Sequence, residues 1–191
     1  LPKSLDVAPL LEEAKRQLHE EADYRREADN LRRFGSLLAD ANDFILPQAV
    51  DALTRSDILA MSWVEGVAAE SLADAPQALR DRIASLLIGL LFRELFEFRL
   101  IQTDPNFANY RFDTASERLV LLDFGATRPY SGTVNEAYRR LMAGAIRGDR
   151  AAMSTAAQEI GYFQDNIHAH QREAVIDLFA TACEPLCHTG A

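Results

Sequence analysis

Lysine is nearly absent from this chain of 191 residues, which contains only Lys3 and Lys15 although it contains 18 arginines. The formal net charge is −9. Nucleic-acid-binding domains usually cluster Lys and Arg on a basic surface, so this acidic composition argues against a general nucleic-acid binder. A site whose chemistry needs a lysine ammonium group could use only Lys3 or Lys15 of this chain.

Cysteine is equally scarce. Cys183 and Cys187 are the only two, and they are spaced i,i+4 with His188 beside the second. Two thiols do not make a disulfide scaffold, and no further ligand stands near them at a recognised zinc spacing. We therefore expect buried or incidental cysteines and a reducing compartment.

Long apolar runs are missing as well. The longest, IASLLIGLLF at residues 83–92, is followed at once by Arg93 and Glu94. It is roughly half as long as a membrane span, so it predicts a buried core helix and no transmembrane segment. No signal peptide opens the chain. Because the sequence begins without Met, we expect a piece of a longer protein.

The remaining composition is that of a globular protein, with 48% apolar and 26% charged residues. Periodicity and capping signals predict helices over about 6–38, 77–100, 133–147, 149–160 and 166–183. Strand patterns and turn residues predict short strands over 47–53, 57–66, 110–113 and 118–123, of which the first two form a hairpin. This order shows no βαβ alternation and predicts an α+β fold.

Two loops carry the residues with the most chemical information. QTDPNFANY (102–110) contains Asp104 and Asn109, and VLLDFGATR (120–128) contains Asp123 at the end of a predicted strand. A hairpin between the loops would fold back and bring its two ends together. Two carboxylates and an amide oxygen at one point are hard ligands that suit Mg²⁺, and phosphoryl transfer uses such a set beside an acid that orients the attacking hydroxyl.

The spacing D-x-x-x-x-N followed by D-F-G matches the protein-kinase signature. A structural interpretation uses the same residues: an Asx-turn at Asp104 and a plain β-turn over 123–125. A D-F-G tripeptide alone is a weak signal. The two motifs in this order, separated by a short strand pair, favour the kinase-like interpretation.

Protein kinases usually have His-Arg-Asp where this chain has Gln-Thr-Asp at 102–104. With QTDPNFANY, LLDFGATR and the stretch EADYRREADN at 21–30, the sequence resembles the UbiB family of atypical kinase-like ATPases linked to coenzyme Q biosynthesis. The resemblance covers about residues 1–149. It implies a protein-kinase-like α+β fold with an incomplete N-lobe at 1–66 (helix C, two strands and the hinge) and a helical C-lobe at 67–191.

The resemblance also implies a role for each motif residue. Asp104 matches the catalytic-loop acid, and Asn109 and Asp123 match the Mg²⁺ ligands. Glu27 matches the helix-C glutamate, which pairs with a nucleotide-binding lysine on a β-strand. These residues would bind ATP and Mg²⁺ in a complete domain.

Two further groups are implied to lie near the nucleotide. Glu21 and Asp23 match the family's E-x-D pair, which faces an N-terminal extension; Asp23 shares a helix face with Glu27, whereas Glu21 does not. By themselves these acids also fit a solvated charged helix. The hinge that meets adenine would be Trp63, Val64 and Glu65, although Trp63 fits a core position equally well.

Several parts of a kinase are missing from the sequence. Nothing before Glu27 resembles a Gly- or Ala-rich phosphate loop, a strand lysine or the family's K-x-G-Q extension, and no A-P-E follows Gly125. We therefore expect the roof of the nucleotide site to lie upstream, and this chain alone to be inactive.

The implied function is that of an ATP- and Mg²⁺-dependent kinase or ATPase that supports ubiquinone biosynthesis. Expected partners are ATP, a lipid or quinone-precursor molecule, quinone-biosynthesis proteins and a membrane surface contacted peripherally. Arginine-rich, alanine-rich usage favours a bacterial source, with the protein in the cytoplasm or on the inner membrane. A phosphotransferase of the aminoglycoside or choline kinase type and a nucleotide-sensing pseudokinase scaffold are the alternatives; DFGATR disfavours the first and the intact loop acids disfavour the second.

Overall fold

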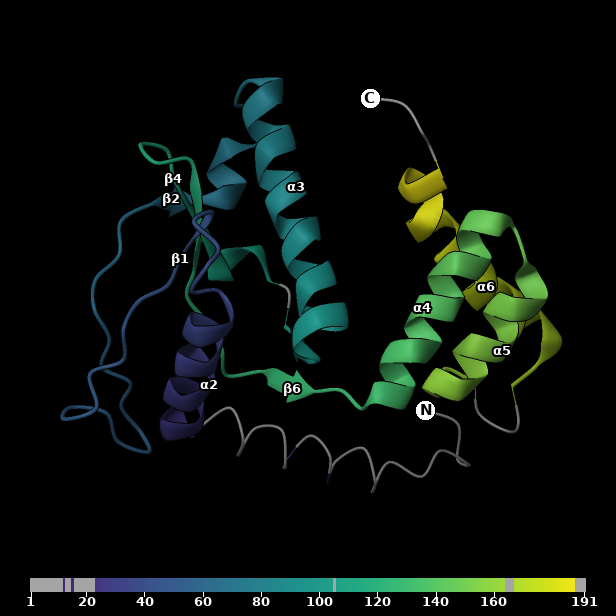
Figure 1. The fold of residues 1–191 in the computed structure, drawn as a ribbon, viewed down its shortest axis with the longest axis horizontal. Helices are drawn as coiled ribbons and strands as arrows, with labels where there is room; N and C mark the ends of the chain where they lie inside the picture. Colours follow the sequence, from purple (N-terminus) through teal and green to yellow (C-terminus); the bar gives the residue numbers. More distant parts are fainter. Residues whose placement is uncertain (1–11, 13–14, 16–22, 105, 164–166, 188–191) are drawn as a thin grey trace, which may run out of the picture. The chain divides into compact units, whose positions relative to one another are not determined.

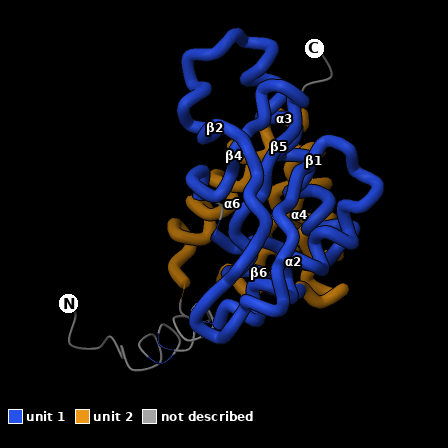
Figure 2. Tube along the Cα trace, turned by 90° about the vertical axis from the view of Figure 1, so that its left-hand side faces the viewer, with its two compact units in different colours: residues 1–129 blue, residues 130–191 orange. Residues whose placement is uncertain are grey.

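The computed structural model describes residues 12, 15, 23–104, 106–163 and 167–187. The chain forms two compact units, residues 1–129 and 130–191 (Figure 2). The first unit contains small sheets and two long helices, and the second is helical (Figure 1). The α+β class is confirmed. The expected boundary between the two lobes at residue 66 remains a prediction. The two compact units are divided at another position, between residues 129 and 130.

Helix α2 (Tyr24–Leu37) is the described part of the first predicted helix. Asp23 caps it by accepting hydrogen bonds from the backbone N–H groups of Arg25 and Arg26, which would otherwise have no partner. The helix continues through Gly35 and ends two residues later. Its buried face consists of Glu27, Ala28, Asn30, Leu31 and Phe34. Two of these five are polar, and both are directed to the functional loops described below.

The central sheet has the strand order β1-β5-β4-β2 (Figure 2). Strands β4 (Tyr110–Asp113) and β5 (Arg118–Leu121) form the expected antiparallel hairpin, with Tyr110 opposite Leu121. Strand β1 (Phe44–Ile45) pairs with β5 in parallel, and β2 (Val67–Ala68) pairs with β4. The hairpin lies at the centre of the core, since Phe112, Leu119, Val120 and Leu121 are fully buried.

A second, two-stranded sheet joins segments on either side of that hairpin. Strand β3 (Leu100–Gln102) runs antiparallel to β6 (Thr127–Pro129), and Gln102 is opposite Thr127. The sequence did not predict either strand, because each is only three residues long. The pairing matters for function: it holds the start of the 102–110 loop beside the end of the 120–128 loop.

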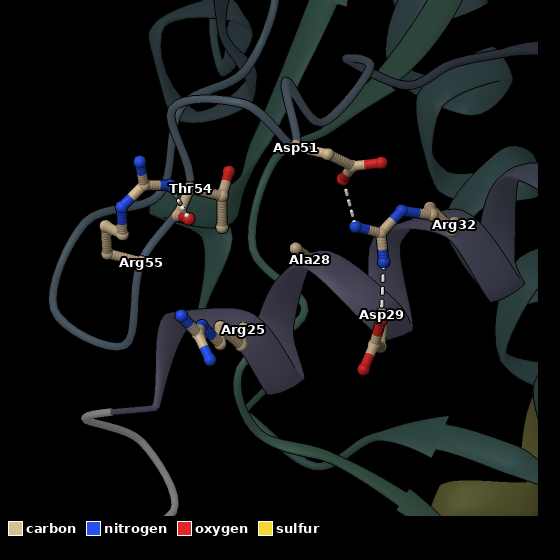
Figure 3. A pocket seen from close by; sticks show the side chains of 7 residues that line it. All are labelled: Arg25, Ala28, Asp29, Arg32, Asp51, Thr54 and Arg55. Carbon is tan, nitrogen blue, oxygen red and sulfur yellow. Dashed lines mark hydrogen bonds and ion pairs between the residues drawn. The ribbon is translucent and has the colours of Figure 1, made fainter.

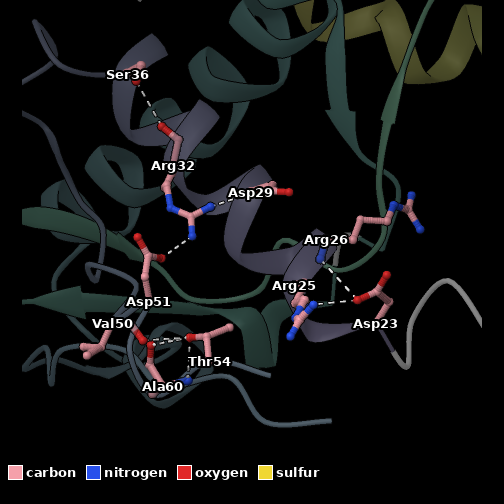
Figure 4. A network of polar contacts seen from close by, with 10 residues as sticks. All are labelled: Asp23, Arg25, Arg26, Asp29, Arg32, Ser36, Val50, Asp51, Thr54 and Ala60. Atoms are coloured by element: carbon pink, nitrogen blue, oxygen red, sulfur yellow. Dashed lines mark hydrogen bonds and ion pairs between the residues drawn. The ribbon is translucent and has the colours of Figure 1, made fainter. Parts of the chain in front are cut away.

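The predicted strands 47–53 and 57–66 are not formed as strands, so that prediction is wrong. The two segments do run antiparallel, but only as isolated bridges between Ala49 and Met61 and between Arg55 and Ile58. The Thr54 hydroxyl donates to the carbonyl of Val50 at 3.0 Å and therefore replaces part of a strand ladder (Figure 4). A hairpin with no third strand beside it is marginally stable, which accounts for the loose pairing.

Helix α3 (Gln77–Arg93) continues as a π-helical turn, η2 (Glu94–Phe98), and the chain then reverses at Arg99 with φ 53°. The predicted helix over 77–100 is thus nearly correct in length. Its burial is one-sided, because Ile88 and Leu91 are about half exposed. No described helix is long and apolar enough to cross a membrane.

The second unit contains α4 (Gly132–Arg147), α5 (Arg150–Ile160), α6 (Ala169–Cys183) and the short turn η4 (Glu184–Cys187). The three long helices confirm the predicted ranges to within a few residues. Gly148 ends α4 in the left-handed conformation at φ 68°, a region that favours glycine. Gly144 lets α5 approach closely, since a Cβ at that position would lie 3.0 Å from Met153. Both cysteines are free thiols in this unit.

Candidate functional site

The 102–110 loop is held at its start by the neighbouring loop. The backbone N–H and the hydroxyl of Thr103 both donate to the carbonyl of Ala126, at 3.0 and 2.6 Å. Asp104 follows directly and its side chain is exposed. The Asn109 amide donates to the Asp104 carbonyl at 3.5 Å. This turn leaves the Asp104 carboxylate facing solvent, as an acid that meets a substrate must be.

Asn109 and Asp123 are brought together by the register of the hairpin. Strands β4 and β5 pair Tyr110 with Leu121, and the backbone N–H of Leu122 donates to the carbonyl of Asn109 at 3.2 Å. Asp123 is the next residue, and its Oδ1 accepts the Gly125 N–H at 2.9 Å. Both side chains are half-buried. The structure therefore places these two residues at one end of the hairpin, beside Asp104.

The pKa of Tyr110 indicates that acids from both loops lie close together. Burial is the main cause that raises the pKa of the Tyr110 hydroxyl to about 12, and the charges of Glu94, Asp104 and Asp123 add to it. A hydroxyl can sense all three only if it lies near each of them. Tyr110 thus lies among the acids of both loops.

Glu27 faces the D-F-G turn from helix α2. It is 8% exposed, and its Oε1 accepts the backbone N–H of Phe124 at 3.5 Å. Burial and the charge of Asp123 raise its pKa, while the Phe124 N–H lowers it. Both carboxylates flank Gly125: a Cβ there would lie 3.4 Å from Asp123 Oδ1 and 3.6 Å from Glu27 Oε2. The glutamate implied for helix C is therefore directed at the functional loop.

The expected hinge and E-x-D residues have different environments. Trp63 is 82% exposed and its indole N–H donates to Glu65 at 2.9 Å, so the alternative of a core tryptophan is wrong. Val64 is partly exposed. Asp23 is the exposed cap of α2 and does not share the buried environment of Glu27. Glu21 lies outside the described residues.

A cavity of about 320 Å³ lies between α2 and the 47–60 segment (Figure 3). Arg25 and Arg55 face it, and Arg32 bridges Asp29 on its own helix and Asp51 in the 47–60 segment. The hydrogen bond to Asp51 is the main cause that raises the pKa of Arg32, and the charge of Asp51 and the contact with Asp29 add to it. The bridge fixes the 47–60 segment to α2 (Figure 4). None of the loop residues lines this cavity, so it is not where the motif chemistry would occur.

The sequence did not predict that two polar residues near the loops, Asn30 and Glu94, are buried. Asn30 of α2 donates to the Phe124 carbonyl at 3.0 Å. Glu94 accepts the backbone N–H of Gln102 at 3.1 Å, and its other oxygen has no hydrogen-bond partner in the described part of the chain. Glu94 and Gln102 line a second cavity of about 210 Å³ behind the 102–110 loop. Asn30 and Glu94 both lie in predicted helices, and nothing in the sequence distinguishes either of them from a surface residue.

Replacing Glu94 with Gln is expected to stabilise the chain at high pH only. Burial raises the pKa of Glu94 from 4.5 to about 7, so the folded state holds an extra proton between these values and stability falls as pH rises through them. At pH 8 the variant should exceed the wild type by up to about 3 kcal/mol, and below pH 4.5 the difference should vanish. Urea unfolding of both proteins across this range measures it. A difference independent of pH would contradict the assignment.

The donor set at the hairpin end fits Mg²⁺. Asp123 uses one carboxylate oxygen for the Gly125 N–H and keeps the other. The side-chain oxygen of Asn109 accepts no hydrogen bond from the described residues, because the contact of this amide to Asp104 is made through its N–H. Mg²⁺ is bound in proteins by one or two carboxylates completed by water and phosphate oxygens. Across the described residues, no group of three or more His, Cys, Asp or Glu side chains could hold a metal ion. A site here therefore relies on the amide and on non-protein ligands.

A catalytic-type loop and a D-F-G turn joined by one hairpin, and contacted by a helix with a buried glutamate, define the chain as a protein-kinase-like domain with a partial N-lobe. The solved structure of the Rv3197–erythromycin complex from Mycobacterium tuberculosis has this fold, with a TM-score of 0.75 and 22% identity over 95% of this chain and 46% of that one. Residues 1–157 match the ABC1 atypical kinase-like domain. The chain belongs to this family, the UbiB-type atypical kinases, as its motifs predicted.

Relatives at higher identity agree. The chain is 36% identical over 165 residues to the mitochondrial atypical kinase coq-8 of Caenorhabditis elegans, covering 84% of this chain and 22% of that protein. It is 32% identical to the mitochondrial atypical kinases COQ8B of Rattus norvegicus and COQ8 of Saccharomyces cerevisiae, covering 100% and 97% of this chain and 36% and 37% of those proteins. The chain thus spans well under half of these relatives.

The comparisons also bear on the alternatives. The relatives described above are named as mitochondrial atypical kinases, and a relative from Arabidopsis thaliana is named as a chloroplastic kinase. These names do not favour an aminoglycoside- or choline-type phosphotransferase or a pseudokinase scaffold. They give no support to a bacterial source. Membership of the family supports a kinase or ATPase type of role.

Proposed function

We propose that this chain supplies the catalytic and metal-binding loops of an ATP- and Mg²⁺-dependent atypical kinase or ATPase that supports ubiquinone biosynthesis. The observation that carries the proposal is the double connection between the loops. Thr103 bonds to Ala126 on one side, and Leu122 bonds to Asn109 on the other. Asp104, Asn109 and Asp123 are thereby held at one end of the hairpin.

Each residue has a separate task in this proposal. Asn109 and Asp123 would hold Mg²⁺, which neutralises charge on the β- and γ-phosphates when bound. The exposed Asp104 would orient the attacking hydroxyl or water and accept its proton. Glu27 would pair with a lysine of the nucleotide site supplied from outside this chain. Lys15, the one lysine described, pairs with Glu12 instead.

The nucleotide and the acceptor would meet other residues. The hinge segment of Trp63, Val64 and Glu65 would contact adenine through its backbone. Asp23, with Glu21, would face an N-terminal extension. The acceptor would be a lipid or quinone precursor, reached by peripheral contact with a membrane and in association with quinone-biosynthesis proteins. The family's link to coenzyme Q and the absence of a peptide-binding A-P-E segment support this choice.

Titration of this chain with ATP tests the proposal. Binding should be weak, because the phosphate roof is not supplied by these residues, and it should require Mg²⁺, because the loop acids repel a bare triphosphate. Calorimetry with Mg²⁺ and with EDTA separates the two conditions. Tight binding that is equal in both would contradict the assignment of Asn109 and Asp123 as ligands.

A further inference from the structure

Helix α2 contacts both backbone polar groups of Phe124, the residue that follows Asp123. The carboxylate of Glu27 accepts the Phe124 N–H at 3.5 Å, and the amide of Asn30 donates to the Phe124 carbonyl at 3.0 Å. Glu27 and Asn30 are 8% and 6% exposed. Two side chains one helical turn apart therefore complete one residue of the D-F-G turn.

Two further contacts attach the same turn to the same helix. Arg26 donates to the Thr127 carbonyl at 3.1 Å. The rings of Phe34 and Phe124 pack with their centroids 5.0 Å apart, and both are fully buried. The segment that follows Asp123 is therefore fixed to α2 at two positions, residues 124 and 127.

Of these contacts, the hydrogen bond from Asn30 depends most on the identity of the side chain. The Phe124 carbonyl accepts two hydrogen bonds, one from the backbone N–H of Thr127 at 3.3 Å and one from Asn30 at 3.0 Å. Only the Asn30 bond comes from α2, and Glu27 as a carboxylate could not donate it. Asn30 is a neutral donor beside two acids, so it completes the turn without adding a third negative charge next to Asp123. Leucine or alanine would suit the helix better by propensity, and neither could make this bond.

We propose that Asn30 is a positioning residue for the metal site: it fixes the Phe124 peptide and thereby the direction of the Asp123 carboxylate. The inference rests on the proposed function, because it assigns Asn30 a role through a metal ligand. It also means that a movement of helix α2 would change the metal site directly. The proposed pair between Glu27 and a lysine would not be needed to transmit that movement. Residues that orient metal ligands typically change metal affinity by 10- to 100-fold when they are replaced.

The test uses Asn30→Asp, which keeps the size of the side chain but replaces the donor with a charge, together with Asn30→Ala. Asn135→Ala is the matched control, because Asn135 is also a buried asparagine in a helix, in the second unit. We expect roughly 10-fold weaker Mg²⁺–ATP binding for both Asn30 variants and unchanged binding for the control. ATP binding in EDTA should not change in any of them.

Hydrogen exchange of the segment 122–128 without ligand provides a readout that needs no activity. It should accelerate in Asn30→Asp and stay unchanged in Asn135→Ala, even if both lose similar amounts of melting temperature. Unchanged exchange, or unchanged Mg²⁺–ATP affinity in a folded Asn30→Asp protein, would overturn the proposal and leave Asn30 as a packing residue.

A double-mutant cycle separates the inference from the function on which it rests. If Asn30 acts through Asp123, Asn30→Asp should add no further loss of Mg²⁺–ATP affinity to Asp123→Asn. Additive losses would show that Asn30 acts elsewhere. If Asp123→Asn alone leaves the Mg²⁺ dependence intact, the proposed metal site is wrong and the role of Asn30 falls with it.

Discussion

Replacing Asp123 with Asn is expected to lower ATP turnover of the whole protein by about 10²-fold or more. Asparagine presents a dipole where Mg²⁺ requires a charge, and losing such electrostatic stabilisation in phosphoryl transfer costs at least this much. The fold should persist, because an Asn oxygen can still accept the Gly125 N–H that Asp123 accepts now. The measurements are the ATPase rate, the Mg²⁺–ATP affinity and the melting temperature, and the first two should fall together.

Asp113→Asn is the matched control for this variant. Asp113 ends strand β4 just before the turn of the same hairpin. Its carboxylate accepts from the Ser116 hydroxyl and the Ala115 N–H, and these bonds lower its pKa. Its role is that of a turn former. If Asp123 were only a turn former too, both variants would lose stability alike and keep their ATPase rate, which would contradict the metal assignment.

Asp104→Asn is expected to reduce turnover by a comparable factor, on the order of 10²-fold or more, while Mg²⁺–ATP affinity stays largely intact. The amide cannot accept the proton of the attacking group, but it leaves both metal ligands in place. Because the Asp104 side chain is exposed, its replacement should change the melting temperature little. The two loop variants thus separate proton transfer from metal binding.

The result against this assignment is equally clear. A wild-type rate in Asp104→Asn would assign the residue to the turn that bonds Asn109 to its carbonyl. A loss of Mg²⁺–ATP affinity equal to that of Asp123→Asn would make Asp104 a third ligand. Failure of both variants to fold would favour the interpretation of the two loops as structural turns.

Much of the site could be predicted because its chemistry lies in contiguous motifs. Asp104, Asn109 and Asp123 are close in sequence to the hairpin that joins them. Its strands follow from the alternation in YRFD and from the apolar run in RLVL. The helices of the second unit were predictable for a similar reason: their caps, such as Asp149 and Gly148, are read locally.

What the sequence did not reveal depends on contacts between distant segments. Strands β1, β3 and β6 have only two or three residues, which is too short for a periodic pattern, so the pairing of β3 with β6 and of β1 with β5 was not predicted. Residues 47–66 alternate like a hairpin but lack a neighbouring strand that would complete a ladder. Asn30 and Glu94 read as surface positions in a helix, and only the fold shows that each is buried against a loop backbone.

The central claim, that one end of the β4–β5 hairpin holds Mg²⁺ and nucleotide, is tested most directly by adding Mn²⁺ and ATP to the isotope-labelled chain. The paramagnetic ion broadens the amide signals nearest to it. We predict that Asn109 and residues 122–125 lose intensity first, and that Asp123→Asn removes this selectivity while Asp113→Asn retains it. Broadening centred on other residues, or the same pattern in Asp123→Asn, would contradict the account.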